Sequence, residues 1–467
     1  MDQVADSLKV VIERQRSAFQ AEPFPSRLVR LERLDRLRRL VKEQAQAFCE
    51  AIAADFGNRS QHETMLLEIS PLLAELRHAR AHVGRWMRPR RRSSSLEFLQ
   101  LSNWVQYQPL GVVGIMVPWN YPVLLALGPL VDVLAAGNRA VIKPSELLPR
   151  TSALLAAVIP DYFNPAEVSV VEGGVDVAQA FAAQPFDHLI FTGSTAVGKR
   201  VMAAAAENLT PLTLELGGKS PVVIAPDYPI EAAAREIAFG KMMNAGQTCI
   251  APDYVLVPRD KMEQLTQALV RQIEAFYPEG SQAANFSSLI AQRFQTRLAN
   301  ALEEVRQQGA RVVVCDIDLS GAGCRFAPTL VLDPPDDCIL MQEEIFGPVL
   351  PVVPYDSIDD ALALIGRKPR PLALYIFTHD RETERRLLMN TISGNVTING
   401  TLLHIAQTDL PFGGVGPSGQ GAYHGYEGFV RFSHARGIAK VRLFNPSVLA
   451  SPPFGAVAKW LARFMMR

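Results

Sequence analysis

Apolar residues recur at helical spacing through residues 4–56, and this spacing predicts a set of helices at the start of the chain. Within this region, the run 25–40 carries its leucines on one stripe and its arginines elsewhere. We expect the leucines to face the core and the arginines to form a solvated face rather than a nucleic-acid or membrane surface. The leucines of the stripe are Leu28, Leu31, Leu34 and Leu37.

Two stretches that follow, and the last residues of the chain, show different patterns. Residues 88–95 are rich in arginine and serine and predict a polar linker. Alternating apolar and polar positions in residues 96–110 predict a hairpin that leaves the main body. Residues 456–467 predict a short, basic, amphipathic helix.

From residue 110 onward, short apolar runs alternate with helical patterns. Such repeated βα units predict a parallel sheet covered on both faces, with ligands bound at the carboxyl ends of its strands. Strands are expected at 112–117, 140–143, 168–171 and 188–192, and helices at 121–136, 149–159, 175–182 and 196–208. A second α/β series is expected from strands at 221–225, 254–257 and 349–356 and a helix at 261–276.

The stretch 111–138 is nearly apolar and long enough to span a bilayer. Three prolines, Pro118, Pro122 and Pro129, divide it, so we interpret it as a buried strand, turn and helix. The N-terminus shows no signal-peptide pattern.

Composition narrows the function classes. Lys plus Arg and Asp plus Glu are equal at 47 each and the pI is near 7.1, so overall charge gives no reason to expect a nucleic-acid partner. The five cysteines form no C-x-x-C pair, and the histidines do not cluster near them. We therefore expect no disulfide framework, no metal site and a reducing cytoplasmic location.

The strongest chemical candidate is Cys249, in the polar, turn-prone string NAGQTC, with Glu215 one βα unit upstream in LELGGKSP. A thiol can form a covalent adduct with an aldehyde, and a carboxylate can activate the water that releases the product. A cysteine can also be buried and purely structural, as we expect for Cys49, and a glutamate between two leucines of a strand can be an exposed edge residue.

Two strand ends offer nucleotide contacts. Gly193 and Gly198 flank a strand-to-helix turn where a phosphate could meet free backbone N–H groups, although a plain turn explains them equally well. Lys143 and Glu146 could hold ribose hydroxyls or form a surface ion pair. Asn120 could present its amide to an oxyanion or cap the following helix.

These strings, together with PWNYP at 118–122 and QEEIFGPV at 342–349, resemble the NAD(P)-dependent aldehyde dehydrogenases over most of the chain. The resemblance implies Cys249 as nucleophile, Glu215 as general base and Asn120 as oxyanion donor. It implies a cofactor site formed by Trp119, Lys143, Glu146, Gly193, Ser194, Gly198, Glu344 and Phe346. A carboxylate at Glu146 disfavours the 2′-phosphate of NADP, so NAD is the expected cofactor, with NADP the alternative.

The resemblance also implies a domain organisation. We expect an α/β fold with a Rossmann-like, parallel-sheet cofactor domain, an α/β catalytic domain and a small β oligomerisation element. The expected ranges are 1–92 and 110–214 for the NAD-binding domain, 215–392 for the catalytic domain, 93–109 and 393–445 for the bridging element, and 446–467 for the tail helix.

Within the family, the short N-terminus and residues 410–434 resemble the class-3 and fatty-aldehyde branch, which implies a homodimer. The segments 244–260 and 399–416 most resemble bacterial coniferyl aldehyde dehydrogenases. Gln420 and Asn399-Gly400 depart from the common pattern, which puts the substrate in doubt more than the chemistry.

The sequence leaves several functions open. The substrate could be a fatty or medium-chain aliphatic aldehyde, the thioester could pass to coenzyme A, or the fold could serve as a non-catalytic binding protein. The tail helix could pack on the partner subunit, cover the substrate entrance or lie on a membrane surface, and its short length favours the first two. His404 and His424 could line the substrate mouth, but hydrogen-bonded structural histidines are the better interpretation.

Overall fold

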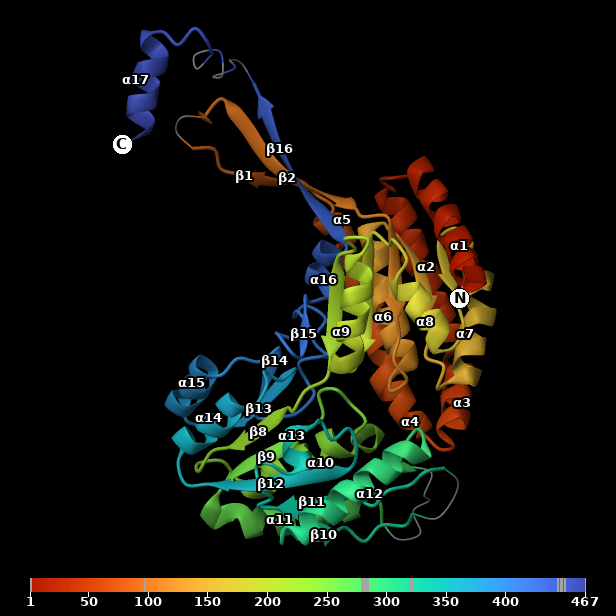
Figure 1. Ribbon diagram of the computed structural model, residues 1–467, viewed down its shortest axis with the longest axis vertical. Coiled ribbons are helices and arrows are strands. Elements are labelled where there is room, and N and C mark those ends of the chain that lie inside the picture. Colours follow the sequence, from red (N-terminus) through yellow and green to blue (C-terminus); the bar gives the residue numbers. More distant parts are fainter. Residues whose placement is uncertain are drawn as a thin grey trace.

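Three β-sheets organise the part of the chain that the computed structural model describes, residues 2–95, 98–278, 285–319, 323–442, 445, 448 and 451–466. Figure 1 shows two α/β bodies stacked along the long axis and a thin arm that projects from the upper one. The upper body contains the first parallel sheet, and the lower body contains the second. The predicted α/β fold with two parallel sheets and a small β element is confirmed.

The first sheet has the strand order β15-β7-β6-β3-β4-β5, and only its edge strand β15 is antiparallel. Its central strands are buried along their whole length, as expected for a sheet covered on both faces. The strands are β3 Val112–Met116, β4 Arg139–Lys143, β5 Val168–Val170, β6 His188–Gly193, β7 Leu212–Leu216 and β15 Gly419–Gln420.

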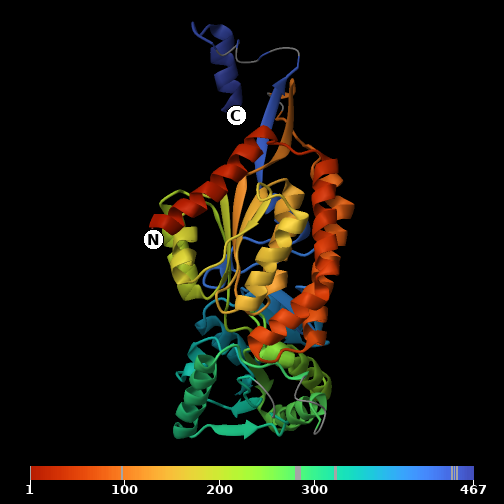
Figure 2. The same cartoon turned by 90° about the vertical axis from the view of Figure 1, so that its right-hand side faces the viewer.

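Helices cover both faces of this sheet, and Figure 2 shows the sheet edge-on between them. One face carries α1 Asp2–Ala21, α8 Val175–Ala182 and α9 Thr195–Ala206. The other carries α2 Arg27–Glu43, α3 Ala45–Phe56, α4 Gln61–Thr64, the π-helix η1 Met65–Ile69, α5 Ser70–Trp86, α6 Pro122–Ala136, α7 Pro149–Tyr162 and α16 Gly425–Arg431. The predicted strands and helices of this region are confirmed to within a few residues.

The prediction of which α2 side chains face the core and which face solvent is partly wrong. Leu34 and Leu37 are buried, but Leu28 is exposed, and Arg30 and Arg33 are buried instead of solvated. Arg30 Nη1 donates to the carbonyls of Ala135 and Ala136 at 2.9 and 2.7 Å, and thereby satisfies the C-terminus of α6. Arg33 pairs with the partly buried carboxylate of Glu167 at 2.9 Å. Spacing along the sequence does not reveal either of these partners.

The stretch 111–138 forms β3, a turn and α6, as expected. Among the described residues, no helix combines the length and the apolar character needed to cross a membrane.

The second sheet has the order β10-β11-β12-β9-β8-β13-β14, in which β10 is the antiparallel edge. Its strands are β8 Pro221–Ile224, β9 Tyr254–Pro258, β10 Arg311–Val314, β11 Thr329–Leu332, β12 Val349–Tyr355, β13 Ala373–Phe377 and β14 Asn395–Ile398. The helical segments of this body are α10 Ile230–Met242, η3 Met243–Gly246, η4 Arg259–Lys261, α11 Met262–Phe276, α12 Gln292–Gln307, α13 Ile339–Gln342, α14 Ile358–Arg367 and α15 Arg381–Asn390.

The arm is a three-stranded antiparallel sheet of β1 Arg90–Arg92, β2 Leu101–Pro109 and β16 Ser433–Val441. It carries the terminal helix α17 Ala456–Met465 away from both bodies (Figure 1). The predicted linker is therefore wrong at Arg90–Arg92, which pair with β2 as its hairpin partner. Of the predicted alternating stretch, residues 96 and 97 lie outside the described residues.

The topology also differs from the expected domain ranges. β7 spans the boundary expected between residues 214 and 215, because the whole strand belongs to the first sheet. Residues 393–445 do not form one unit, since β14 completes the second sheet, β15 pairs with β7 and only β16 lies in the arm. Hydrogen bonds between strands far apart in the sequence decide to which sheet each strand belongs. Continuous residue ranges cannot describe such pairing.

Candidate functional site

A cavity of about 560 Å³ lies where the carboxyl ends of β3, β4, β6 and β7 face the second body. Ten of the eleven candidate residues line it: Trp119, Asn120, Lys143, Glu146, Gly193, Ser194, Glu215, Cys249, Glu344 and Phe346. The site thus occupies the edge of the sheet where parallel strands bind ligands.

Gly198 is the exception. It lies one turn into α9 on the face toward the sheet, where a Cβ would come within 2.7 Å of the Leu216 side chain. Its small size allows close packing of helix on strand, and its expected cofactor contact stays a prediction.

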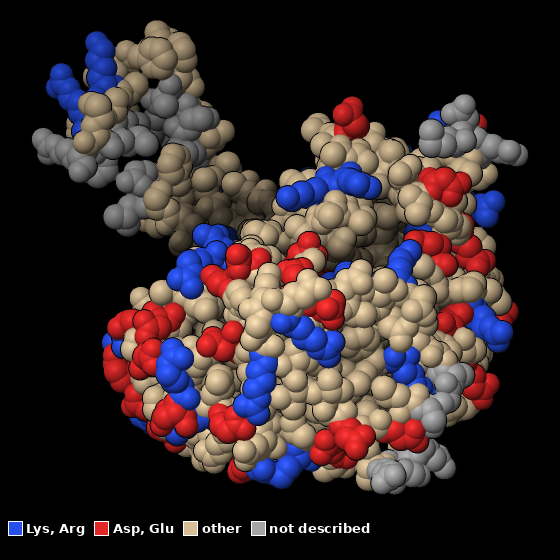
Figure 3. Space-filling view, turned by 60° about the horizontal axis from the view of Figure 1, so that its bottom comes forward, with Lys and Arg blue, Asp and Glu red and all other residues tan. Residues whose placement is uncertain are grey.

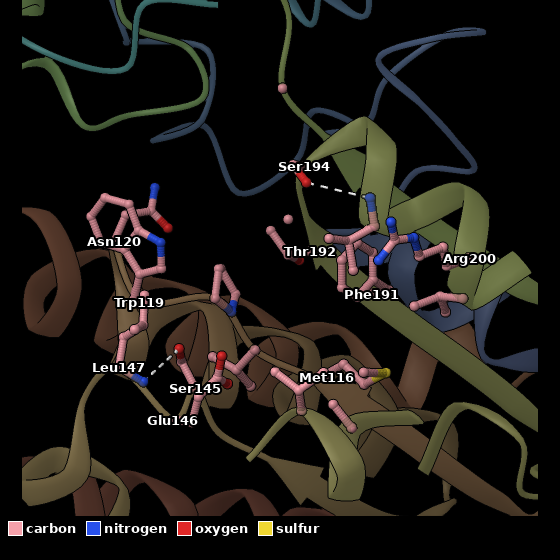
Figure 4. A pocket seen from close by; sticks show the side chains of 18 of the residues that line it. Met116, Trp119, Asn120, Ser145, Glu146, Leu147, Phe191, Thr192, Ser194 and Arg200 are labelled. Carbon is pink, nitrogen blue, oxygen red and sulfur yellow. Dashed lines mark hydrogen bonds between the residues drawn. The ribbon is translucent and has the colours of Figure 1, made fainter. Parts of the chain in front are cut away.

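The turn from β6 into α9 has the form of a phosphate-binding helix start. Ser194 is the N-cap residue, and its Oγ accepts a hydrogen bond from Val197 N at 3.4 Å. Figure 4 shows Ser194 across the cavity from Trp119 and Asn120, with Ser145 and Glu146 below them in this view. The remaining N–H groups of the first turn and the positive end of the helix dipole suit an anion.

Lys143 and Glu146 form a pair at the end of β4. Lys143 is buried, and its Nζ donates to Pro144 O at 2.8 Å and to Glu146 Oε2 at 3.5 Å. Burial lowers the pKa of Lys143, and the Glu146 carboxylate opposes this shift. The Glu146 side chain is 41% exposed and lines the cavity, so its carboxylate can meet a hydroxyl pair.

Cys249 follows a strained segment. Asn244 and Ala245 both have φ of +51° and Gly246 has φ of +75°, so three successive residues adopt the left-handed region. Gly246 is required there, because a Cβ would collide with the carbonyl of Gly347. Tyr121 Oη and Thr248 Oγ1 lie 2.6 Å apart and Tyr375 Oη donates to Ile250 O, so both neighbours of the cysteine are fixed.

The thiol is not activated in this arrangement. Burial and, less strongly, the carboxylates of Glu344 and Glu215 raise the pKa of Cys249 to about 12. A thiol that reacts at neutral pH needs a nearby positive charge. The groups that shift this pKa are two carboxylates and two backbone N–H groups, and no cation is among them.

The Asn120 side chain lies against the cysteine loop. Its Nδ2 donates to Gln247 O at 3.1 Å, which uses one of the two N–H bonds of the amide. The second N–H is available to a substrate oxygen. Asn120 is 3% exposed, so this donor is held away from bulk water.

Glu215 extends from β7 into the same cavity and is also only 3% exposed, rather than an exposed edge residue. Neither carboxyl oxygen has a hydrogen-bond partner in the described structure. Burial raises the pKa of Glu215 well above its usual range, and Arg431 opposes this shift. A carboxyl group with a raised pKa and unpaired oxygens suits a general base that meets water or substrate.

Glu344 lies above the Gly217-Gly218 turn. Gly218 N donates to its Oε1 at 3.1 Å, and a Cβ at Gly217 would overlap the carboxylate, so the glycines make room for it. Phe346 packs edge-on against Trp119 with ring centroids 5.4 Å apart.

The sequence analysis did not predict several groups in and around the cavity. Phe294 of α12 packs 5.2 Å from Trp119, and Arg293 and Arg297 also line the cavity. Lys219 pairs with the buried Asp253, whose Oδ1 accepts from Ile345 N at 2.9 Å, beside Glu344. The position of Lys219 directly after Gly217-Gly218 was an available signal, whereas α12 carries no motif.

His404 and His424 are both buried and do not line this cavity. His404 Nδ1 lies 2.8 Å from Thr397 Oγ1, and His424 Nε2 lies 3.4 Å from Glu75 Oε1. Their burial and these contacts agree with the structural interpretation, which stays a prediction. Within the described ranges, no group of three or more His, Cys, Asp or Glu side chains could hold a metal ion.

A dinucleotide fits these residues. The α9 N-terminus can take a phosphate, the Lys143–Glu146 pair can take ribose hydroxyls, and the cavity continues past Trp119 and Phe346 to Cys249. The unpaired oxygens of Glu215 lie in the same cavity as the thiol. The arrangement can therefore place a redox cofactor and a covalent thiol adduct side by side.

Comparisons with known proteins agree with this geometry. A model of the aldehyde dehydrogenase family matches residues 5–438. A Pseudomonas aeruginosa protein named probable coniferyl aldehyde dehydrogenase is 48% identical, over 100% of this chain and 98% of its own. Aldehyde dehydrogenase family 3 member A2 of Rattus norvegicus is 38% identical, over 98% and 94%.

Solved structures extend the likeness to the fold. The substrate-bound state of Staphylococcus aureus AldH has a TM-score of 0.91 and 34% identity, covering 98% of this chain and 99% of that chain. A Mycobacterium tuberculosis aldehyde dehydrogenase complexed with NAD+ has a TM-score of 0.85 and 30% identity, covering 94% and 91%.

Proposed function

The chain belongs to the aldehyde dehydrogenase family, and from that membership we propose coniferyl aldehyde, or a related aromatic aldehyde, as its substrate. The enzyme oxidises an aldehyde to the carboxylic acid with NAD as cofactor. The observation that carries the mechanism is the placement of Cys249, Asn120 and Glu215 around one cavity. The 48% identity to a protein named for coniferyl aldehyde supports the substrate class.

In the first half-reaction, the Cys249 thiol gives its proton to water, and the thiolate Sγ attacks the aldehyde carbon to form a tetrahedral adduct. The second N–H of Asn120 and the backbone N–H of Cys249 donate to the oxyanion, which stabilises charge that develops only at this stage. A bound NAD would supply a positive charge in the cavity and a hydride acceptor. Loss of the hydride from the adduct leaves a thioester on Cys249.

In the second half-reaction, Glu215 takes a proton from a water molecule whose oxygen attacks the thioester carbon. The carbon–sulfur bond breaks, the thiolate of Cys249 leaves and the carboxylic acid is released. Burial on β7 keeps the Glu215 carboxyl free of competing donors, so it can hold the water. This use of water distinguishes the proposal from acyl transfer to coenzyme A.

The substrate class is tested with coniferaldehyde and a long-chain aliphatic aldehyde, by comparing kcat/KM from NADH formation. We expect coniferaldehyde to be preferred by about 10-fold or more, because shape differences in an apolar pocket discriminate on that scale. A preference for the aliphatic chain would retain the mechanism and replace coniferyl aldehyde with a fatty aldehyde. Acyl-CoA formation on addition of coenzyme A would instead favour an acylating enzyme.

The preference for NAD over NADP is proposed to depend on the charge of Glu146. A negative carboxylate next to the ribose site repels a 2′-phosphate. We expect Glu146→Gln to lower the NAD-to-NADP ratio of kcat/KM about 10-fold, whereas Glu146→Asp, which keeps the charge, retains the preference. A wild-type enzyme that prefers NADP would contradict this assignment.

The arm supports a homodimer as the assembly. Residues 432–467 contain six Lys or Arg and no Asp or Glu, so the rest of the chain holds 41 basic against 47 acidic side chains. Figure 3 shows Lys and Arg on the projecting α17. A basic arm complements the net acidic body of a second copy. Sedimentation velocity at low and high salt tests this, and a monomer at all protein concentrations would refute it.

The cysteine pattern supports a cytoplasmic location, since a nucleophilic thiol and four unpaired companions suit a reducing compartment.

A further inference from the structure

Three charged side chains lie behind the cavity wall, outside the site described above. Arg59, Glu63 and Glu68, here called the charged triplet, are all buried, and none of them lines the cavity. Arg59 lies in the connection between α3 and α4, Glu63 in α4 and Glu68 in η1. Removing charges from water is costly unless each one is paired and hydrogen-bonded, so their contacts indicate what they hold in place.

Arg59 joins the triplet to the oxyanion donor. Its Nη1 donates to Asn120 O at 2.8 Å and lies 3.1 Å from Glu68 Oε1, in an ion pair whose two side chains are fully buried. The guanidinium also lies 4.8 Å above the centre of the Tyr121 ring. Arg59 therefore contacts both residues of the turn that presents the Asn120 amide.

Glu68 fixes the other side of that turn. Its Oε2 accepts from the backbone N–H groups of Val123 and Leu124 at 2.8 and 3.1 Å. These groups belong to the first turn of α6, where a carboxylate satisfies orphan donors and complements the helix dipole. The helix that begins two residues after Asn120 is thus anchored to the same ion pair.

Glu63 holds the strained segment that leads to Cys249. Its two oxygens accept from Asn244 N at 3.2 Å each, and Ser287 Oγ donates to it at 2.6 Å. Asn244 Nδ2 in turn donates to Asn120 O at 3.0 Å, so Arg59 and Asn244 share one carbonyl oxygen. The left-handed backbone at Asn244 and Ala245 persists only because its surroundings determine it.

We propose that Arg59 is a positioning residue for the oxyanion hole. Through the Asn120 carbonyl, it sets the separation between the Asn120 side-chain amide and the backbone N–H of Cys249. The first donor lies at the end of β3 and the second follows α10, so no local backbone geometry links them. This inference rests on the proposed role of Asn120 in the reaction.

The test is a double-mutant cycle on the rate of NADH formation. Asn120→Ala is expected to lower kcat on the order of 10²–10³-fold, the cost of one oxyanion donor. Arg59→Lys keeps the buried charge but loses the planar fork, and is expected to lower kcat about 10- to 100-fold through misplacement of the amide. In the Asn120→Ala background, Arg59→Lys should cost little more, while NADH binding stays unchanged.

Arg30→Lys is the matched control. Arg30 is equally buried and, like Arg59, donates to backbone carbonyls, but these belong to Ala135 and Ala136 at the C-terminus of α6. Its replacement is expected to lower the melting temperature, leave kcat nearly unchanged and combine additively with Asn120→Ala. If Arg59→Lys does not fold, Glu68→Gln, which preserves the side-chain shape, takes its place in the same cycle. Its expected loss of kcat is smaller and should also vanish in the Asn120→Ala background.

The outcomes separate the two levels of the proposal. If Asn120→Ala retains full kcat, the proposed role of Asn120 itself fails. If Asn120→Ala loses activity but Arg59→Lys costs the same with and without the amide, Arg59 has only a structural role and the inference is overturned. A loss confined to the background that contains Asn120 supports it.

Discussion

Replacing Cys249 with alanine removes aldehyde oxidation and leaves NADH binding intact. The alanine cannot form the tetrahedral adduct, so the hydride never becomes available, and kcat should fall on the order of 10⁴-fold or more. The cofactor contacts proposed at the α9 N-terminus and at Lys143 do not involve the thiol, so binding should persist. NADH formation measures the first effect and fluorescence titration with NADH the second.

Cys324→Ala provides the control for this change. Cys324 is partly exposed but lies outside the cavity, so its loss should leave kcat unchanged.

Because the pKa of Cys249 is raised to about 12, its alkylation by iodoacetamide without cofactor should still accelerate at pH 9 and above, where an ordinary thiol near ~8.5 levels off. Residual oxidation by Cys249→Ala would assign the nucleophile elsewhere.

Replacing Glu215 with glutamine should allow one turnover and then stall the enzyme. The amide keeps the shape of the side chain but cannot accept a proton from water, so the thioester forms and persists. A stopped-flow trace should show a burst of NADH close to one per active site, followed by a steady rate at least about 100-fold below wild type, the usual contribution of a general base. An absent burst would contradict the assignment of Glu215 to the second half-reaction.

The pH dependence of the wild type should report the same carboxyl. Burial raises the pKa of Glu215 well above its usual range, and only the deprotonated form can act as a base. Steady turnover should therefore rise with pH through the raised pKa and fall below it, while the burst is less affected. In Glu215→Gln this limb of the profile should disappear.

The sequence predicted the strands, the cavity edge and ten of the eleven lining candidates, because short motifs at strand ends report local backbone geometry. It did not predict the partners of buried charges. Arg30, Arg33 and Arg59 are typical surface residues by type, and only contacts with segments far along the chain explain their burial. Likewise, the pKa of Cys249 is raised first by burial and then by Glu344 and Glu215, and the extent of that burial cannot be read from the spacing of the motifs.

Gly198 illustrates the limit of motif matching. A glycine one turn after a phosphate-type turn fits a binding fingerprint, but a helix presents each successive residue about 100° further round. Gly198 faces Leu216, and Ser194 is the residue at the helix start. The direction in which a residue points around the helix axis decides whether it can meet a ligand. Packing of the helix on the sheet fixes that direction.

The base and the nucleophile stand on different sheets, since Glu215 belongs to β7 of the first body and Cys249 precedes β9 of the second. Their spacing is therefore a property of the junction between the bodies rather than of either core. Because the larger apolar core contains buried residues of both bodies, heating should open this junction only as the core itself melts. Loss of activity on heating is then expected to coincide with the main calorimetric transition, and inactivation well below that transition would contradict this expectation.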